Sequence, residues 1–270
     1  MQFLPQFFDL LVIISLLVIL LCNKKNILFI NSTKFYFCPF FYTKAPIALT
    51  FSPLNFIIIM VMKILLCNIE KCELSQIPLD KLSERTKNKV EALQNTNPRR
   101  AVQSAISDLM IRSELLSRGV LPCDFLENEN GKPFFDGLDL CFSIAHSKKI
   151  VAVAFDDAPV GIDVQMLAPM DKKLVEKILN EGELENYNTL EMQEQKIKYF
   201  YRCFTEKEAY VKLLGETLPY PPSLIKNYLG AKFVTKYLFQ DNEVYCLTVS
   251  SKNLNSISFS VLSPKQLITT

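Results

Sequence analysis

Short apolar runs bounded by turn residues recur between residues 62 and 165, and this pattern predicts β-strands. The predicted strands cover residues 62–69, 138–145, 150–155 and 160–164. A turn at residues 156–159 joins the last two. Because three of these strands follow one another closely, we expect an antiparallel sheet. The single histidine, His146, falls just past the end of the strand at 138–145, where a side chain leaves the core.

Apolar residues at helical spacing alternate with these strands. The predicted helices cover residues 99–118, 171–180 and 191–214, and Gly119 and Gly215 end the first and the last. Further strands are predicted at residues 224–228, 231–239, 243–250 and 256–262, with a hairpin turn at residues 240–242.

The order of elements is strand, helix, three strands, helix, strands, which predicts an α+β fold. The second half roughly echoes the first as a helix backed by antiparallel strands. We therefore expect two similar lobes, residues 62–158 and 159–270, with the active site in the cleft between them. Asp163 and Glu208 would lie on the rim of that cleft.

Residues 1–61 differ in composition from the rest of the chain. They hold one acid, four lysines, no glycine and half of the twenty phenylalanines. The apolar run at residues 10–22 is shorter than the roughly 20 residues that a bilayer span needs, and no basic residue precedes it. A membrane anchor stays an alternative, but we expect that the segment is not part of the native folded domain, which begins at Met62 and is cytoplasmic.

Charge and cysteine usage exclude some classes of function. Residues 62–270 carry 26 basic and 27 acidic residues, and near-neutrality argues against nucleic acid as a partner, because binding to phosphate backbones needs a basic face. The eight cysteines include no C-x-x-C pair, so they are typical of buried thiols in a reducing compartment rather than of a zinc site.

One face of the helix at 191–214 carries residues whose side chains could take part in binding or catalysis. Phe204, Glu208 and Lys212 recur every four residues and therefore stack one turn apart. Such a Glu–Lys pair is usually solvated surface. Upstream, however, Asp163 sits in an apolar strand, where a carboxylate is costly unless it is paired or binds a metal.

Other candidate residues are individually weak signals. Lys132 lies at a tight turn ahead of a strand, His146 is alone, and Arg99 and Arg100 begin a helix whose N-terminus favours phosphate. Each of these is more often ordinary surface or a structural residue, so only their combination raises the expectation of a site.

In order, the chain carries GKP at 131–133, FSIAHS at 142–147, VGIDV at 160–164 and FTEKEAYVK at 204–212. This series resembles the ordered signature of the 4′-phosphopantetheinyl transferases, and is most similar to their larger, pseudo-dimeric, surfactin-synthetase type. The resemblance covers nearly all of residues 62–270. It implies Mg²⁺-dependent transfer of the phosphopantetheine arm of coenzyme A to a serine of an apo acyl, peptidyl or polyketide carrier protein by a monomeric holo-acyl-carrier-protein synthase, in fatty acid, lysine or secondary-metabolite biosynthesis.

Site roles follow from the same resemblance. Asp163 and Glu208 would bind Mg²⁺, with Gln165 as a further ligand, and Glu208 and Lys212 would carry the chemistry. Basic residues would contact coenzyme A, and the candidates are Lys132, His146, Lys207, Lys87, Lys89, Arg99 and Arg100.

The chain departs from the family pattern at several positions. Gln165 stands where the family often has Glu, which removes one charge from the metal site. Ser143 and Ala145 replace the usual Asn and Ser, and Phe204 replaces the usual Trp. An alternative is therefore a non-catalytic module that binds coenzyme A or a carrier protein. The sequence does not identify the carrier.

Overall fold

The computed structural model describes residues 61–254 and 256–269. The predictions made for residues 1–60 lie outside this part of the chain. The elements in chain order are β1 (Met62–Asn68), η1 (Leu74–Gln76), η2 (Leu79–Lys81), α2 (Glu84–Leu93), α3 (Pro98–Ser117), β2 (Leu126–Glu127), β3 (Pro133–Phe134), β4 (Cys141–Ser147), β5 (Ile150–Asp156), β6 (Val160–Met166), α4 (Lys172–Ile178), α5 (Glu181–Thr189), α6 (Gln193–Leu214), η3 (Pro222–Leu224), β7 (Lys232–Gln240), β8 (Glu243–Ser251), β9 (Ile257–Leu262) and α7 (Pro264–Thr269). The mixed α+β class is confirmed.

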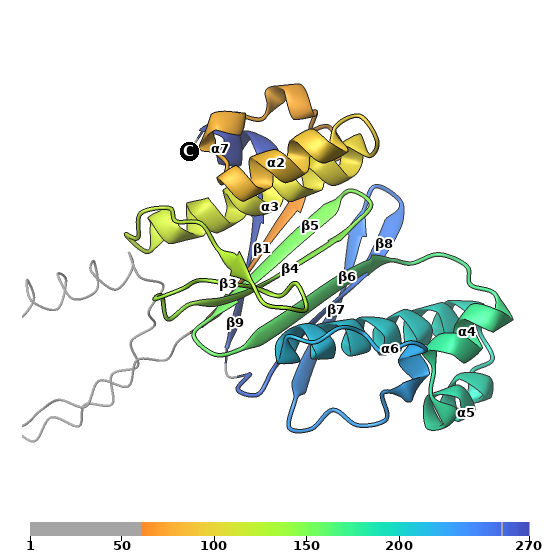
Figure 1. Cartoon of the computed structure of the whole chain (residues 1–270). Helices are drawn as coiled ribbons and strands as arrows, with labels where there is room; N and C mark the ends of the chain where they lie inside the picture. The colour runs from red at the N-terminus through yellow and green to blue at the C-terminus, as the bar shows by residue number, and fades with distance from the viewer. Residues whose placement is uncertain (1–60, 255, 270) are drawn as a thin grey trace, which may run out of the picture. The chain divides into compact units, whose positions relative to one another are not determined.

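Two main sheets form the centre of the fold (Figure 1). The first has the strand order β4-β5-β1-β9 and the second β6-β8-β7. All neighbours are antiparallel except β1 and β9, which run parallel. The hairpin predicted between β7 and β8 is confirmed, with Asp241 and Asn242 in the left-handed region at φ 46° and 64°.

The sheets pack face to face between two helical layers. One face of β1, with Ile64 and Leu66, meets β6 and β8 of the second sheet in a shared apolar core. The opposite face of β1, with Leu65 and Cys67, lies against α3. Burial on both faces explains why β1 is apolar at nearly every position. The order of layers is α2, α3 and α7, then the two sheets, then α6 (Figure 1).

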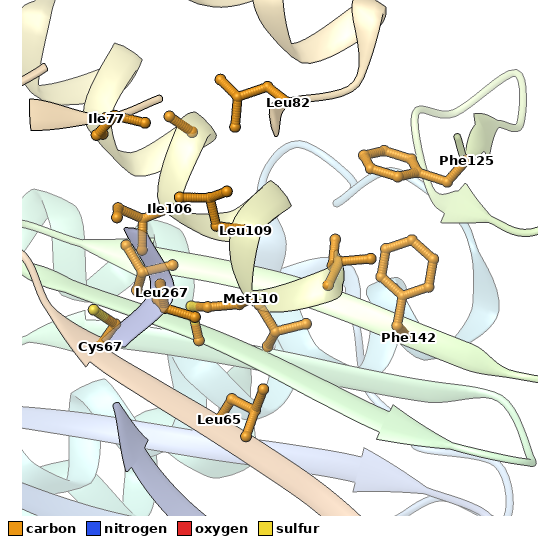
Figure 2. Close-up of a cluster of buried hydrophobic side chains, with 14 of the residues drawn as sticks. Leu65, Cys67, Ile77, Leu82, Ile106, Leu109, Met110, Phe125, Phe142 and Leu267 are labelled. Atoms are coloured by element: carbon orange, nitrogen blue, oxygen red, sulfur yellow. The ribbon is translucent and has the colours of Figure 1, made fainter. Parts of the chain in front are cut away.

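The helix α3 carries the core on the outer face of the first sheet. Ile106, Leu109 and Met110 are buried against the strands, with Phe142 of β4 beside them (Figure 2). Each side chain of this size contributes about 1.5–3 kcal/mol when it is fully buried. Asn97 caps the helix by accepting a hydrogen bond from the Arg100 amide, so the sequence fixes where α3 begins.

A glycine lets α6 approach the second sheet closely. A Cβ atom at Gly161 of β6 would lie 1.9 Å from the Ala209 carbonyl oxygen and 2.6 Å from the Leu213 amide nitrogen. From the neighbouring strand β8, the Ser250 hydroxyl donates to the same Ala209 carbonyl at 2.7 Å. Only glycine fits at this contact, and it brings α6 against the face of β6 that also carries Asp163.

Three sequence predictions about the strands are wrong. Residues 160–164 were expected to join the sheet of the two preceding strands, but β6 pairs with β8 in the second sheet. One face of β6 packs on the first sheet and its other face packs on α6. Residues 224–228 form no strand: Leu224 ends the short helix η3, and residues 225–228 have no regular structure. His146 lies within β4 rather than beyond its end.

The C-terminal segment departs from the predicted division at residues 158 and 159. Strand β9 pairs with β1, with Ile64 opposite Phe259, and α7 packs against α3. Residues 257–269 therefore belong to the layers built by the first half of the chain, and residues 62–270 make up one compact unit. The helix predicted at 171–180 is α4, and the polar stretch after it forms α5.

Within the described residues, none of the helices combines the length and the apolarity that crossing a bilayer requires. The six cysteines of this part of the chain are free thiols: Cys67, Cys72, Cys123, Cys141, Cys203 and Cys246.

Candidate functional site

The helix α6 presents two charged residues to a cavity. Glu208 and Lys212 lie one turn apart on one face and both line it, whereas Phe204, one turn earlier, packs with Phe200 in an apolar cluster. The helix ends at Gly215, which adopts φ 76° as its cap. The three residues that were predicted to share one face thus divide into an apolar contact at Phe204 and a charged pair, Glu208 and Lys212, at the cavity.

Asp163 of β6 is buried, with 4% of its surface exposed, and every oxygen of its carboxylate has a partner. The Lys212 ammonium donates to Asp163 Oδ1 at 2.7 Å and to the Ile162 carbonyl at 3.0 Å. The side-chain amide of Gln165 donates to Asp163 Oδ2 at 3.1 Å. This pairing offsets the cost of burying the charge.

Glu208 is the more weakly stabilised carboxylate of the two. Burial raises its pKa, the negative charge of Asp163 raises it further, and Lys212 opposes these effects. Two carboxylates share one ammonium here, so the site holds negative charge that a cation would stabilise.

The cavity has a volume of about 350 Å³ and is lined by α2, α3, β4, α6 and the loop between β2 and β3. Its basic lining residues are Arg85, Lys89, Arg100, Lys132, His146 and Lys212. Acidic residues, Glu208 among them, also line it. The cavity therefore has a basic region beside the Glu208 carboxylate of α6, and its lining residue Lys212 pairs with Asp163 of β6.

The basic groups crowd one another. Burial lowers the pKa of Lys89, and the charges of Arg100 and Arg85 lower it further. Burial also lowers the pKa of Arg100. A bound anion would relieve this repulsion, so the cluster fits a phosphate group.

His146 is neutral in this setting. The Arg100 guanidinium donates to its Nδ1 atom at 2.7 Å, which leaves Nε2 as the nitrogen that carries hydrogen. Burial lowers the pKa of His146 to about 4, with contributions from Arg100 and Lys212. The ring can therefore donate one hydrogen bond to a ligand without adding charge.

The oxygen donors fit a hard divalent cation. Mg²⁺ usually takes one or two carboxylates and completes its shell with water and substrate phosphates. Asp163 and Glu208 supply that number, and the amide nitrogen of Gln165 faces Asp163, which leaves its oxygen free to face elsewhere. Over residues 61–269 without Asn255, no cluster of three or more His, Cys, Asp or Glu side chains could hold a metal. Oxygens of a bound substrate would thus have to complete the shell.

Five predicted site residues do not line the cavity. Asp163 and Gln165 lie next to it, behind the lining residue Lys212, and three basic residues lie elsewhere. Lys207 is fully buried and pairs with Glu183 of α5, at 2.6 Å from Oε1, because it projects from a different face of α6 than Glu208. Lys87 pairs with Glu84 at 2.7 Å. Arg99 is exposed and lines a different cavity. The structure therefore does not bring these three residues to the cavity.

Arg85 is a cavity residue that the sequence analysis missed. It pairs with Glu127 and lies one helical turn before Lys89, so both project from the same face of α2. The spacing of four residues between Arg85 and Lys89 was the available signal in the sequence. Lys87 lies two residues from each of them and therefore projects from another face of α2.

Lys132 lines the cavity, but its ammonium is held by backbone carbonyls. It donates to Leu213 at 2.8 Å and approaches Val160 at 3.5 Å. Burial lowers its pKa. Its contact with a phosphate stays a prediction.

Comparisons with known proteins agree on one family. The model of the 4′-phosphopantetheinyl transferase superfamily matches residues 159–267. The chain is 34% identical over 130 residues to the 4′-phosphopantetheinyl transferase gsp of Aneurinibacillus migulanus, covering 46% of this chain and 53% of that protein. It is 28% identical over 151 residues to the 4′-phosphopantetheinyl transferase psf-1 of Bacillus pumilus, covering 54% of this chain and 64% of that protein.

A shorter relative is covered almost completely. The chain is 33% identical over 104 residues to the holo-acyl-carrier-protein synthase of Lactococcus lactis subsp. lactis (strain IL1403), covering 37% of this chain and 86% of that protein. Of the two longer transferases, by contrast, the chain spans less than two thirds.

Proposed function

Since the chain belongs to the 4′-phosphopantetheinyl transferase superfamily, we propose that it transfers the phosphopantetheine arm of coenzyme A to a serine of an apo carrier protein. The observation that carries this proposal is a cavity in which a basic cluster adjoins the Glu208 carboxylate, with Asp163 paired to the lining residue Lys212. A molecule with several phosphates matches that distribution of charge.

Coenzyme A would bind with its phosphates along the basic lining. Arg85, Lys89 and Arg100 are the cationic groups of α2 and α3, and their mutual repulsion favours an anion. His146 would donate one hydrogen bond from Nε2 to a phosphate oxygen. These residues are our candidates for the contacts to the 3′-phosphate and the pyrophosphate.

Asp163 and Glu208 would hold Mg²⁺, with the Gln165 oxygen as a further ligand. When bound, the ion would supply neutralisation of the pyrophosphate charge, which is its usual contribution to phosphoryl transfer. Gln165 brings no charge, so we expect weaker Mg²⁺ binding than a third carboxylate would give.

The residues of α6 would carry the proton and charge changes. The carrier serine Oγ forms a bond to the β-phosphorus of coenzyme A, and the bond from that phosphorus to the bridging oxygen breaks, which releases adenosine 3′,5′-bisphosphate. Glu208 would accept the serine proton, and its raised pKa suits a general base better than an ordinary carboxylate. Lys212 would stabilise the negative charge on the leaving phosphate.

We also propose that the cavity is the cleft of a two-lobed, pseudo-dimeric arrangement. Residues 62–158 and 159–256 would form the two lobes, and β9 would belong to the first lobe. Support comes from the lining, which draws on α2, α3 and β4 on one side and α6 on the other. The protein would act as a monomer in the cytoplasm, and the free cysteines are consistent with a reducing compartment.

A mass measurement tests the activity. The full chain is incubated with coenzyme A, Mg²⁺ and a panel of apo carriers from fatty-acid, polyketide and peptide synthetases. We expect at least one carrier to gain the mass of the phosphopantetheine arm, and chelation of Mg²⁺ to prevent it. Binding of coenzyme A without any gain in mass of a carrier would refute the transferase activity and favour a non-catalytic binding module. The uncharged Gln165 beside Asp163 is compatible with that alternative.

A further inference from the structure

The basic cluster of the cavity already contains an anion of its own. Glu127 of β2 lines the cavity, and its carboxylate forms an ion pair with Arg85 of α2. Burial and the charges of Arg100 and Arg85 lower the pKa of Lys89, and the charge of Glu127 opposes this effect. Glu127 therefore neutralises part of the positive charge that we expect a phosphate to meet.

The pair of Glu127 and Arg85 is partly open to water. The side chain of Glu127 is 35% exposed and that of Arg85 is 36% exposed. Asp108, another acidic residue of the lining, is buried instead, and it accepts hydrogen bonds from the Ser83 amide at 2.8 Å and from Arg112 Nε at 3.2 Å. The Asp108 carboxylate is thus fixed within the fold, whereas the Glu127 carboxylate can leave its partner and be hydrated.

Arg85 is held at the cavity by a contact that does not depend on Glu127. Its guanidinium carbon lies 5.3 Å from the centroid of the Phe125 ring, which is within the range of a cation–π interaction. Phe125 is buried and packs edge-on against Phe142 of β4, with ring centroids 5.4 Å apart. The ring therefore keeps the guanidinium beside the cavity when its anionic partner changes.

A phosphate group of a ligand would compete with Glu127 for Arg85. An ion pair between exposed side chains contributes little, because water screens it and two long side chains lose freedom. A terminal phosphate brings roughly two negative charges, and it can accept two parallel hydrogen bonds from one guanidinium. Lys89 and Arg100 line the same cavity and would add to its attraction. The exchange therefore favours the phosphate, at the cost of separating Glu127 from Arg85.

We propose that Glu127 is an internal counter-anion that a ligand phosphate displaces from Arg85, and that it lowers the affinity of the cavity for coenzyme A. Its kinetic consequence rests on the proposed transferase function. Coenzyme A and the released adenosine 3′,5′-bisphosphate share the phosphorylated nucleoside, so a contact made to both lowers KM without raising kcat. By weakening this contact, Glu127 helps the product to leave.

Calorimetry on the full chain tests the exchange, with coenzyme A and adenosine 3′,5′-bisphosphate as separate ligands. Glu127→Gln keeps the volume of the side chain and removes its charge. Glu129→Gln is the matched control, because it makes the same change of charge two residues away, at an exposed residue that does not line the cavity. Arg85→Met and its double variant with Glu127→Gln complete the cycle, and circular dichroism checks that each variant is folded.

We expect Glu127→Gln to bind both ligands about fivefold more tightly than the parent, and Glu129→Gln to stay within about twofold of it. The gain should be smaller in the Arg85→Met background, because the competition takes place at Arg85. In steady-state kinetics, the KM for coenzyme A and the inhibition constant of the bisphosphate should fall together in Glu127→Gln, while kcat does not rise.

Other results overturn the exchange. Unchanged or weaker binding by Glu127→Gln would show that Glu127 only holds Arg85 in place. An equal gain with and without Arg85, or an equal gain in Glu129→Gln, would assign the effect to net charge alone. If the parent chain binds coenzyme A but transfers nothing, the proposed function fails by itself, and the calorimetric affinities still decide the role of Glu127.

Discussion

The Lys212 ammonium of α6 lies 2.7 Å from Asp163 Oδ1 of β6 and forms an ion pair with it. The side chain of Asp163 is 5% exposed and that of Lys212 is 29% exposed, so the carboxylate depends on this partner more than the ammonium does. One interaction therefore stabilises the contact between α6 and β6 and also places a cation beside the two carboxylates of the site.

Lys212→Met should destabilise the fold and abolish transfer. Removing one partner of a largely buried pair leaves an uncompensated charge, which costs about 3 kcal/mol or more when both groups are buried. Because Lys212 is partly exposed, we expect about 2 kcal/mol by urea unfolding. The double variant with Asp163→Asn should regain part of this stability without activity. Equal stability of the single and double variants would contradict the dependence of Asp163 on Lys212.

Glu208→Gln should abolish transfer while the protein stays folded. The change keeps the volume of the side chain but removes the charge that the metal and the serine proton would both need. Since the folded state raises the pKa of Glu208, its ionised form costs stability above the ordinary pKa of a glutamate. The variant should therefore melt at or above the parent temperature at neutral pH.

Glu206→Gln is the matched control for this change. Glu206 lies two residues away, on another face of α6, and pairs with Arg202 at 3.8 Å. We expect transfer near the parent rate by the mass assay. Equal loss of activity in both folded variants would show that the catalytic face of α6 has been assigned wrongly.

Gln165→Glu should keep or raise transfer at limiting Mg²⁺. A third carboxylate adds charge opposite the ion. The same change replaces a hydrogen-bond donor to Asp163 by a second negative charge, so the metal-free protein should melt at a lower temperature. A Mg²⁺ titration of transfer and of the melting temperature measures both effects. A large loss of turnover at saturating Mg²⁺ would show that the Gln165 amide itself is needed.

His146 makes the stability depend on pH in a definite window. Its pKa falls from 6.5 to about 4 on folding, so between these values the unfolded chain binds more protons than the folded one. The contribution of His146 to the free energy of unfolding is fully present above pH 6.5 and is lost as the pH falls toward 4. The chain has one histidine, so a single imidazole signal reports the titration by NMR. A midpoint near 6.5 in the folded protein would contradict the neutral ring beside Arg100.

Gly161→Ala should be severely destabilising, by about 3 kcal/mol or more, because the new methyl group meets the backbone of α6. Activity should fall with it, since α6 must move away from Asp163. Gly182→Ala in α5 is the control. Its Cβ has no contact closer than 3.8 Å, and we expect a stability gain of up to about 1 kcal/mol. Chemical unfolding of both variants checks the contrast.

The sequence by itself determined the local structure and one side of the site. The run at residues 191–214 predicted α6, and Gly215 predicted its end, because both follow from local propensity and backbone freedom. Helical spacing also placed Glu208 and Lys212 on one face. The same spacing places Lys207 on a different face and Arg85 with Lys89, so these two errors came from incomplete use of a local rule.

Only the tertiary structure decided which elements meet. Strand β9 could not be assigned to β1 from its alternation, since a strand pattern gives its faces but not its partner. The ion pair of Lys207 with Glu183, the neutrality of His146 and the hold of Lys132 on α6 depend on groups that lie 24, 46 and 81 positions away in the chain. Burial and charge at a site are sums over such distant neighbours, whereas helix and strand periodicity is written in consecutive residues.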